Sequence, residues 1–150
     1  SIVSATDRCN MVKLAIKPFD YMSLSTIETD RPGNTYTADT LAQIYDSYKK
    51  IYFIIGADSL LYIQDWYHPE YICSHCHLLC ANRDNNSASV LIDQKHFLAD
   101  KYGAVIDFID VPKLPYSSTD IRKKVAMGLS VKEDVGEEVE EYIKSRKLYV

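Results

Sequence analysis

The stretch Ile51-Tyr52-Phe53-Ile54-Ile55-Gly56-Ala57-Asp58 sets an unbroken apolar run directly before a glycine and an acidic turn. β-Branched and aromatic residues favour a strand, and a run without polar alternation is typical of a strand buried on both faces of a parallel sheet. Similar runs occupy residues 76–81 and 104–109, with apolar residues at helical spacing over 90–102 between them. This alternation predicts an α/β fold: an open, mostly parallel sheet with flanking helices.

Further elements flank this pattern. Thr6-Asp7-Arg8 opens a helical pattern that Pro18 ends, and Thr37-Ala38-Asp39 opens another. A last helix is expected over roughly 137–146, where the acidic residues, Glu140 among them, are expected to form a solvated face. Residues 19–27 are interpreted as a short strand, followed by turn-forming residues at 28–34.

Length and composition indicate one soluble globular domain over residues 1–150. The chain is 47% hydrophobic and 25% charged, and its formal net charge is −4. Because it has no basic stripe, we expect no nucleic-acid partner. With no apolar run of membrane-spanning length and no signal-peptide pattern, we also expect no membrane partner. Its four cysteines are expected to be reduced thiols in a cytoplasmic protein.

Polar residues gather where the predicted strands end. Gly56 permits close approach of a ligand, and the Asp58 carboxylate can accept hydrogen bonds from ribose hydroxyls. The alternative is a tight strand–helix turn capped by Asp58. Residues 82–83 and the approach to Ser117 are expected at the same edge of the sheet.

Ser117-Ser118-Thr119-Asp120-Ile121-Arg122 lies at the predicted start of a helix, after the helix-breaking segment 111–115. Hydroxyls, free backbone N–H groups and the helix dipole suit a phosphate, and the arginine can add charged donors. The alternative is an ordinary helix cap beside a solvent-facing arginine.

Trp66 is the only tryptophan of the chain, and Tyr67 follows it. In a polar, irregular segment, such a ring can stack on a flat heterocycle, with an added cation–π contribution if the heterocycle is a pyridinium. The alternative is a lid residue that closes over the sheet edge.

Cys73, Cys76 and Cys80, together with His68, raise the possibility of zinc. A structural zinc site usually needs a second ligand pair at a distance, and the sequence offers none. Because Cys76 and Cys80 also fit one side of a buried strand, we expect no metal site here.

Four motifs in order carry a family resemblance: 35–41 (TYTADTL), 53–60 (FIIGADSL), Trp66-Tyr67 and 117–122 (SSTDIR). With the ending over 139–149, they resemble bacterial nicotinate-nucleotide adenylyltransferases, within the nucleotidyltransferase superfamily. The resemblance implies transfer of an adenylyl group from ATP to nicotinate mononucleotide, giving deamido-NAD and pyrophosphate in NAD biosynthesis. It also implies a Rossmann-like α/β fold, and Mg²⁺ with the ATP.

The same resemblance implies roles for individual residues. Tyr36, Thr37, Trp66 and Tyr67 are expected to hold the pyridine, with backbone amides near Thr37 and Tyr67 for its carboxylate. Gly56, Asp58, Ser118, Thr119 and Arg122 are expected to bind ATP.

The family's opening strand, Gly-rich loop and His-x-Gly-His motif have no counterpart in the 150 residues. The catalytic residues are therefore unknown, the sheet is expected to lack its first strand or strands, and this chain is expected to be poorly active. A second hypothesis is a non-catalytic nucleotide-binding or assembly fragment that pairs with another chain as a homo-oligomer. A third is a related nucleotidyltransferase with another acceptor.

Overall fold

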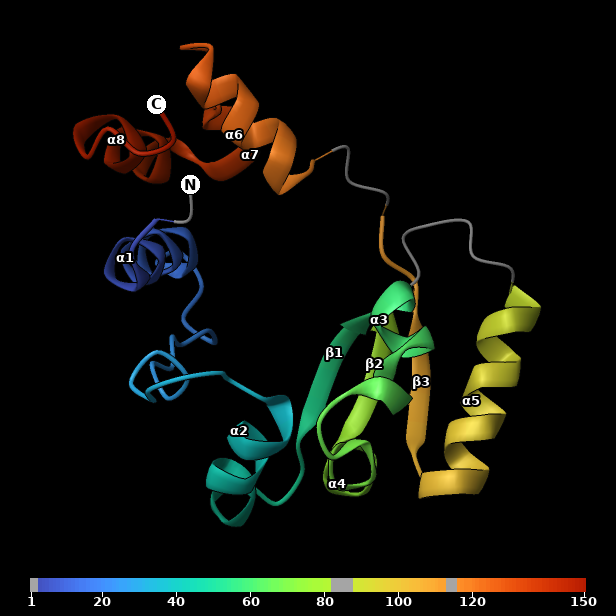
Figure 1. The fold of residues 1–150 in the computed structure, drawn as a ribbon. Helices are drawn as coiled ribbons and strands as arrows, with labels where there is room; N and C mark the ends of the chain where they lie inside the picture. Colours follow the sequence, from blue (N-terminus) through green and yellow to red (C-terminus); the bar gives the residue numbers. More distant parts are fainter. Residues whose placement is uncertain (1–2, 82–87, 113–115) are drawn as a thin grey trace. The chain divides into compact units, whose positions relative to one another are not determined.

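The computed structural model describes residues 3–81, 88–112 and 116–150. These residues form two compact units (Figure 1). The sheet unit comprises residues 33–114, and the helical unit comprises residues 1–32 and 115–150. The single domain expected from the length stays a prediction.

Three parallel strands form the sheet in the order β1-β2-β3 (Figure 1). They are β1 (Tyr52–Gly56), β2 (His77–Ala81) and β3 (Val105–Ile109). Gly56, Ala81 and Ile109 are register partners, so the carboxyl ends of the strands meet at one edge. The α/β fold with a parallel open sheet is confirmed, while residues 82–83 lie outside the described residues.

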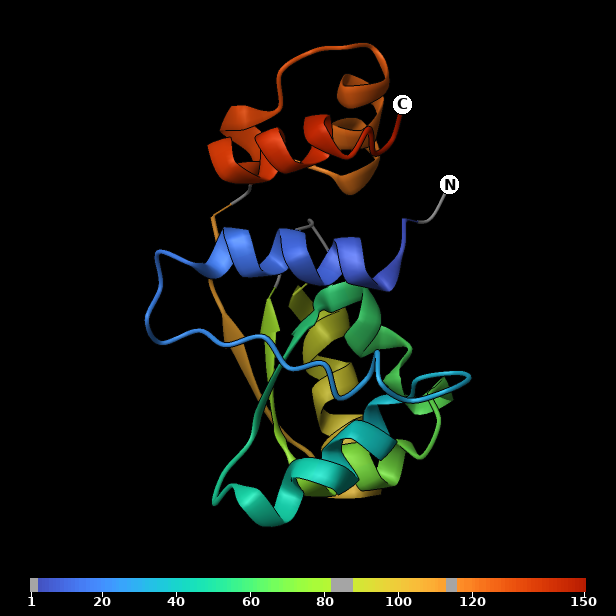
Figure 2. The same ribbon diagram turned by 90° about the vertical axis from the view of Figure 1, so that its left-hand side faces the viewer.

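Helices flank this sheet and close its core (Figure 2). They are α2 (Thr37–Ile44), η1 (Tyr45–Ser47), α3 (Ala57–Leu61), η2 (Ile63–Asp65), α4 (Pro69–His75) and α5 (Ala88–Tyr102). Leu60, Ile72 and Leu98 pack with Leu78 and Ile106 of the sheet, all five being at most 2% exposed. In the described ranges, no helix combines the length and apolar character that a membrane crossing requires.

Two residues explain where helices of this unit begin and end. Pro69 stands in the first turn of α4, where a missing N–H costs no hydrogen bond. Gly103 ends α5 at φ +68°, with its N–H donating to Ala99 O and the next N–H donating to Leu98 O. The bond from the Gly103 N–H to Ala99 O is that of an αL C-cap, which favours glycine because of the positive φ.

The prediction that β1 is buried on both faces was wrong. Ile55 is 4% exposed, whereas its neighbours Tyr52 and Ile54 are 50% and 66% exposed. Residues 53 and 55 share a face with Leu78, Cys80 and Ile106, and that face alone meets the core. Burial on a second face would need a second packed layer, which the apolar run by itself does not specify.

The helical unit contains α1 (Ala5–Ile16), α6 (Ser118–Ala126), α7 (Lys132–Val135) and α8 (Glu137–Ser145). Its core joins Val139 and Ile143 of α8 to Met11 and Leu14 of α1. Residues 19–27 form turns and irregular backbone rather than the short strand expected. Phe19, Tyr21 and Met22 are 43–76% exposed, so this segment has no packed face to hold it as a strand.

The solvated acidic face expected on the last helix was wrong for Glu140, whose side chain is only 9% exposed. Its carboxylate accepts hydrogen bonds from Ser130 Oγ and the Val131 N–H, both at 2.7 Å, and lies 2.9 Å from Lys144 Nζ. These hydrogen bonds lower the pKa of Glu140 to about 2. Glu140 therefore binds the segment just before α7 instead of facing water.

Candidate functional site

The four residues expected to hold a pyridine line one cavity of the sheet unit. This cavity encloses about 370 Å³, and its lining comprises Thr35, Tyr36, Thr37, Asp65, Trp66, Tyr67 and Ile72. Two segments contribute: one leads into α2, and the other joins η2 to α4. They meet because α2 packs against α4. Packing thus brings together residues that lie about 30 positions apart in the sequence.

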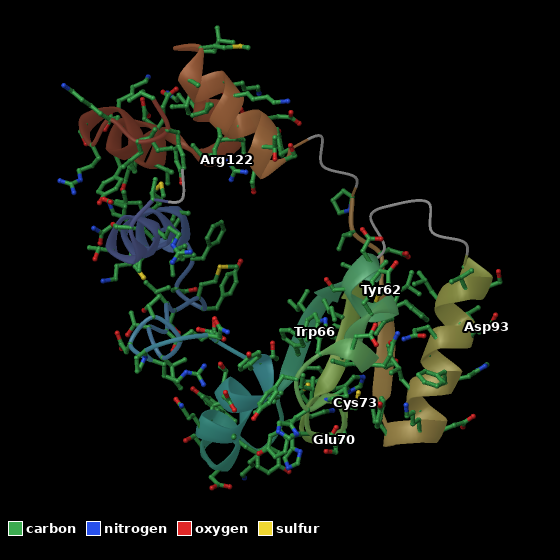
Figure 3. All side chains as sticks on the ribbon, viewed as in Figure 1. Tyr62, Trp66, Glu70, Cys73, Asp93 and Arg122 are labelled. Atoms are coloured by element: carbon green, nitrogen blue, oxygen red, sulfur yellow. The ribbon has the colours of Figure 1, made fainter. Side chains whose placement is uncertain are left out.

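Aromatic rings form much of this cavity wall. The Tyr36 and Tyr67 ring centroids lie 4.5 Å apart at an interplanar angle of 33°. Trp66 lies beside the sheet (Figure 3), and its ring meets the Phe53 ring edge-on at 6.3 Å. Trp66 is half-buried against the hydrophobic core, so core packing accounts for more of its contacts than the sequence suggested. The ring both packs on the core and lines the cavity.

The start of α2 supplies hydrogen-bond donors at the same cavity. Tyr36 is the N-cap residue, and its side chain makes no capping hydrogen bond. As at any helix start, the first N–H groups have no intrahelical acceptor, and the helix dipole adds partial positive charge. The Asp65 carboxylate also lines the cavity, and its negative charge is opposite in sign to the partial positive charge of these donors. Flat cationic rings that bear a carboxylate match this combination of aromatic faces, carboxylate and N–H groups.

Gly56 and Asp58 stand at the carboxyl edge of the sheet, as expected. Gly56 ends β1 at φ −76° and ψ 156°, and α3 begins at the next residue. Any residue adopts that backbone conformation, so the turn itself does not require glycine. The exposed Asp58 lies in the first turn of α3. The tight strand–helix turn is present, with Gly56 rather than Asp58 at the N-cap position.

Ser118, Thr119 and Arg122 lie on the first turns of α6, and all three are exposed. Ser117 caps the helix: its Oγ accepts from the Asp120 N–H at 3.0 Å and donates to Asp120 Oδ2 at 2.6 Å. The ordinary cap weighed from the sequence is therefore present at Ser117. Arg122 Nη2 lies 3.4 Å from Thr119 Oγ1, so these two side chains share one surface of the helix.

The five residues expected to bind ATP divide between the units. Gly56 and Asp58 belong to the sheet unit, whereas Ser118, Thr119 and Arg122 belong to the helical unit. Each group is ordered by its own local contacts, and their joint action on one nucleotide stays a prediction.

The three clustered cysteines belong to the hydrophobic core of the sheet unit. Cys73, Cys76 and Cys80 are free thiols at most 8% exposed, and Cys76 Sγ donates to Ile72 O. Burial raises the pKa of Cys73 to about 11 and that of Cys76 to about 12, which keeps both thiols protonated at neutral pH. Within the described residues, no three His, Cys, Asp or Glu side chains come together as metal ligands.

The sequence analysis missed three residues of the cavity lining, namely Thr35, Asp65 and Ile72. Thr35 and Asp65 directly precede Tyr36 and Trp66, so adjacency in the chain was the available signal. Ile72 is fully buried in α4, a short helix that the sequence pattern did not reveal.

Comparisons with known proteins agree with this architecture. Residues 1–124 match the cytidylyltransferase-like family. A protein from Lachnoclostridium phytofermentans named "probable nicotinate-nucleotide adenylyltransferase" is 34% identical over 151 residues, covering 99% of this chain and 76% of the relative. One of the same name from Caldicellulosiruptor bescii is 35% identical, covering 99% and 75%.

Among solved structures, the Plasmodium falciparum nicotinic acid mononucleotide adenylyltransferase complexed with NaAD matches with a TM-score of 0.75. At 19% identity it covers 99% of this chain and 76% of the other, and it supports the fold. The chain belongs to the nicotinate-nucleotide adenylyltransferase family of cytidylyltransferase-like proteins.

Proposed function

We propose that this chain serves adenylyl transfer from ATP to nicotinate mononucleotide, giving deamido-NAD and pyrophosphate. The observation that carries the proposal is the cavity of about 370 Å³ in which Tyr36, Thr37, Trp66 and Tyr67 gather at the start of α2. Family membership supports the same reaction, since the curated relatives carry that name.

The cavity offers complementary partners to each part of nicotinate. The aromatic faces suit the flat, positively charged ring of the mononucleotide, and Asp65 adds an attractive carboxylate on the lining. The N–H donors at the start of α2 suit the nicotinate carboxylate. In nicotinamide an uncharged amide stands at this position: its oxygen is a weaker acceptor, and its NH₂ group cannot accept from these donors. The pocket is therefore proposed to prefer the acid over the amide.

In the proposed reaction, a phosphate oxygen of the mononucleotide attacks the α-phosphorus of ATP. A new P–O bond forms there, the bond to the bridging oxygen of the β-phosphate breaks, and pyrophosphate leaves with that electron pair. We propose that Gly56 and Asp58 contact the nucleoside, while Ser118, Thr119 and Arg122 bind the phosphates. Such positioning and charge stabilisation account for most catalysis in transfers of this type.

The proposed Mg²⁺ is compatible with the residues of this chain, because it does not require a dedicated set of protein ligands. The described residues contain no dedicated ligand cluster, and Mg²⁺ is commonly held mainly by nucleotide phosphates and water. When bound, the ion neutralises phosphate charge. We propose that it arrives with ATP, and the residues of this chain then bind and orient the two nucleotides.

The proposal is tested by titrating the 150-residue chain with nicotinate mononucleotide and, separately, with nicotinamide mononucleotide. Because Trp66 is the only tryptophan, quenching of tryptophan fluorescence reports stacking at this position alone. We expect saturable quenching with tighter binding of the acid. Absence of binding by either mononucleotide, in a chain with the far-UV circular dichroism of an α/β fold, would contradict the proposal.

Turnover is measured separately from binding. The chain is expected to form little deamido-NAD by itself, because the sequence contains no counterpart of the family's histidine motif. Rapid synthesis by the purified chain would overturn that expectation. Ligand binding without turnover in a stable homo-oligomer, seen by sedimentation, would favour the assembly hypothesis. The cytoplasmic location stays a prediction.

A further inference from the structure

His68 has an unusual backbone conformation beside the proposed pyridine pocket. It lies between Tyr67, which lines that pocket, and Pro69, which begins α4. Its φ of 50° and ψ of 60° fall in the left-handed region, which few non-glycine residues adopt. The chain changes direction at this residue, and His68 lines a separate cavity of about 550 Å³ that Tyr67 does not line.

Ring contacts connect His68 to the pocket through Tyr67. The His68 ring meets the Tyr67 ring edge-on, with centroids 4.1 Å apart at 72°. The Tyr67 ring in turn lies 4.5 Å from that of Tyr36. Tyr67 is 47% exposed, so these two neighbours supply much of what can fix its orientation.

The His68 ring has its own restraint. Its Nδ1 lies 2.9 Å from Glu70 Oε1 in the first turn of α4. The two side chains are 53% and 58% exposed, so this pair adds little to overall stability. Its effect is local: it limits the rotation of the imidazole that contacts Tyr67.

We propose that His68 is a positioning residue for the pyridine pocket, holding the Tyr67 ring against Tyr36 through its left-handed backbone and its contact with Glu70. This inference rests on the proposed function. His68 does not line the proposed pyridine pocket but the neighbouring cavity, so its proposed role is exerted through Tyr67. His68 contributes by keeping the Tyr67 wall of the pocket ordered before the pyridine ring of the ligand enters.

The test compares His68→Asn with wild type in the tryptophan-quenching titration. Asparagine also tolerates the left-handed conformation, so the backbone turn is retained while the ring contact with Tyr67 is lost. We expect about two- to tenfold weaker binding of nicotinate mononucleotide, the size of one aromatic pair contact. The affinity for ATP is expected to stay unchanged, and the variant is expected to stay folded at the assay temperature. His96→Asn, an exposed histidine of α5, is the matched control.

The outcomes separate the two proposals. Failure of the wild-type chain to bind nicotinate mononucleotide overturns the proposed function. If wild type binds and His68→Asn binds equally well, the positioning role is wrong. A variant that loses affinity for both nucleotides, or is unfolded at the assay temperature, assigns His68 a general structural role and also overturns the inference. Recovery of affinity in His68→Tyr, which restores a ring, supports it.

Discussion

Replacing Trp66 by alanine removes an aromatic wall of the cavity while leaving the neighbouring backbone amides in place. The ring lines the cavity of about 370 Å³, so the variant loses one face against which a pyridinium can stack. Stacking of a base on an aromatic side chain contributes ~1–3 kcal/mol by alanine substitution. The dissociation constant for nicotinate mononucleotide should therefore rise about 5- to 150-fold.

A second effect of this substitution must be separated from the first. Trp66 also packs against the core and meets Phe53 edge-on at 6.3 Å. Such an aromatic pair contributes ~0.5–1.5 kcal/mol, so Trp66→Ala should lower the melting temperature while the chain stays folded at room temperature. Trp66→Phe keeps a ring and is expected to retain much of the affinity.

Isothermal titration calorimetry is the suitable assay, because both variants lack the fluorescent tryptophan. It is run beside a thermal melt of each protein, and folded protein at the assay temperature is required for the comparison. A folded Trp66→Ala variant that binds nicotinate mononucleotide as tightly as wild type would refute the stacking argument. That result would leave core packing as the role of the Trp66 ring.

Three further predictions follow from other residues. Arg122→Gln should weaken ATP binding by about 10- to 150-fold, the range of a charge-assisted hydrogen bond. Lys123→Gln on the same helix is the control and should change ATP affinity little. Equal losses of affinity in the two variants, measured by titration, would contradict a specific phosphate contact of Arg122. Glu140 has a pKa of about 2 in the folded chain against an ordinary value of 4.5, so the stability it confers is present above the ordinary value and is lost as pH falls from about 4.5 to about 2. Glu140→Gln should flatten this part of the stability profile in denaturant titrations at a series of pH values, and an unchanged acid limb would argue against the assignment. The Cys76 thiol, with its pKa raised to about 12 by burial, should react with iodoacetamide far more slowly than the half-buried Cys9, and mass spectrometry showing equal rates would contradict its burial in the folded chain.

Local sequence was sufficient for several elements. The run before Gly56 predicts β1, and the hydroxyl residues at 117–119 predict the start of α6, because strand propensity and capping depend on near neighbours. The parallel direction of the strands was also predictable, since alternating strands and helices restrict the possible connections between strands. The extent of burial was less predictable: the exposure of Ile54 depends on how many layers cover the sheet.

Contacts between distant residues explain what else could not be predicted. Glu140 resembles its acidic neighbours in sequence, and only the turn that brings Ser130 and the Val131 N–H to it makes it buried. The contact of His68 with Tyr67 likewise depends on a left-handed backbone that no residue pattern specifies. For the cavity, the resemblance named Tyr36 and Trp66, whereas Ile72 enters through the packing of α4.

The contacts between α1 and α8 have a consequence for the order in which this chain folds during synthesis. Asp7 accepts a hydrogen bond from Tyr142, 135 residues later, and also pairs with Arg146. The sheet unit, in contrast, is one continuous segment over 33–114. The whole sheet unit leaves the ribosome before α8 emerges, so that unit can fold first. Until the last helix emerges, Met11 and Leu14 of α1 lack their packing partners Val139 and Ile143 and stay exposed to water.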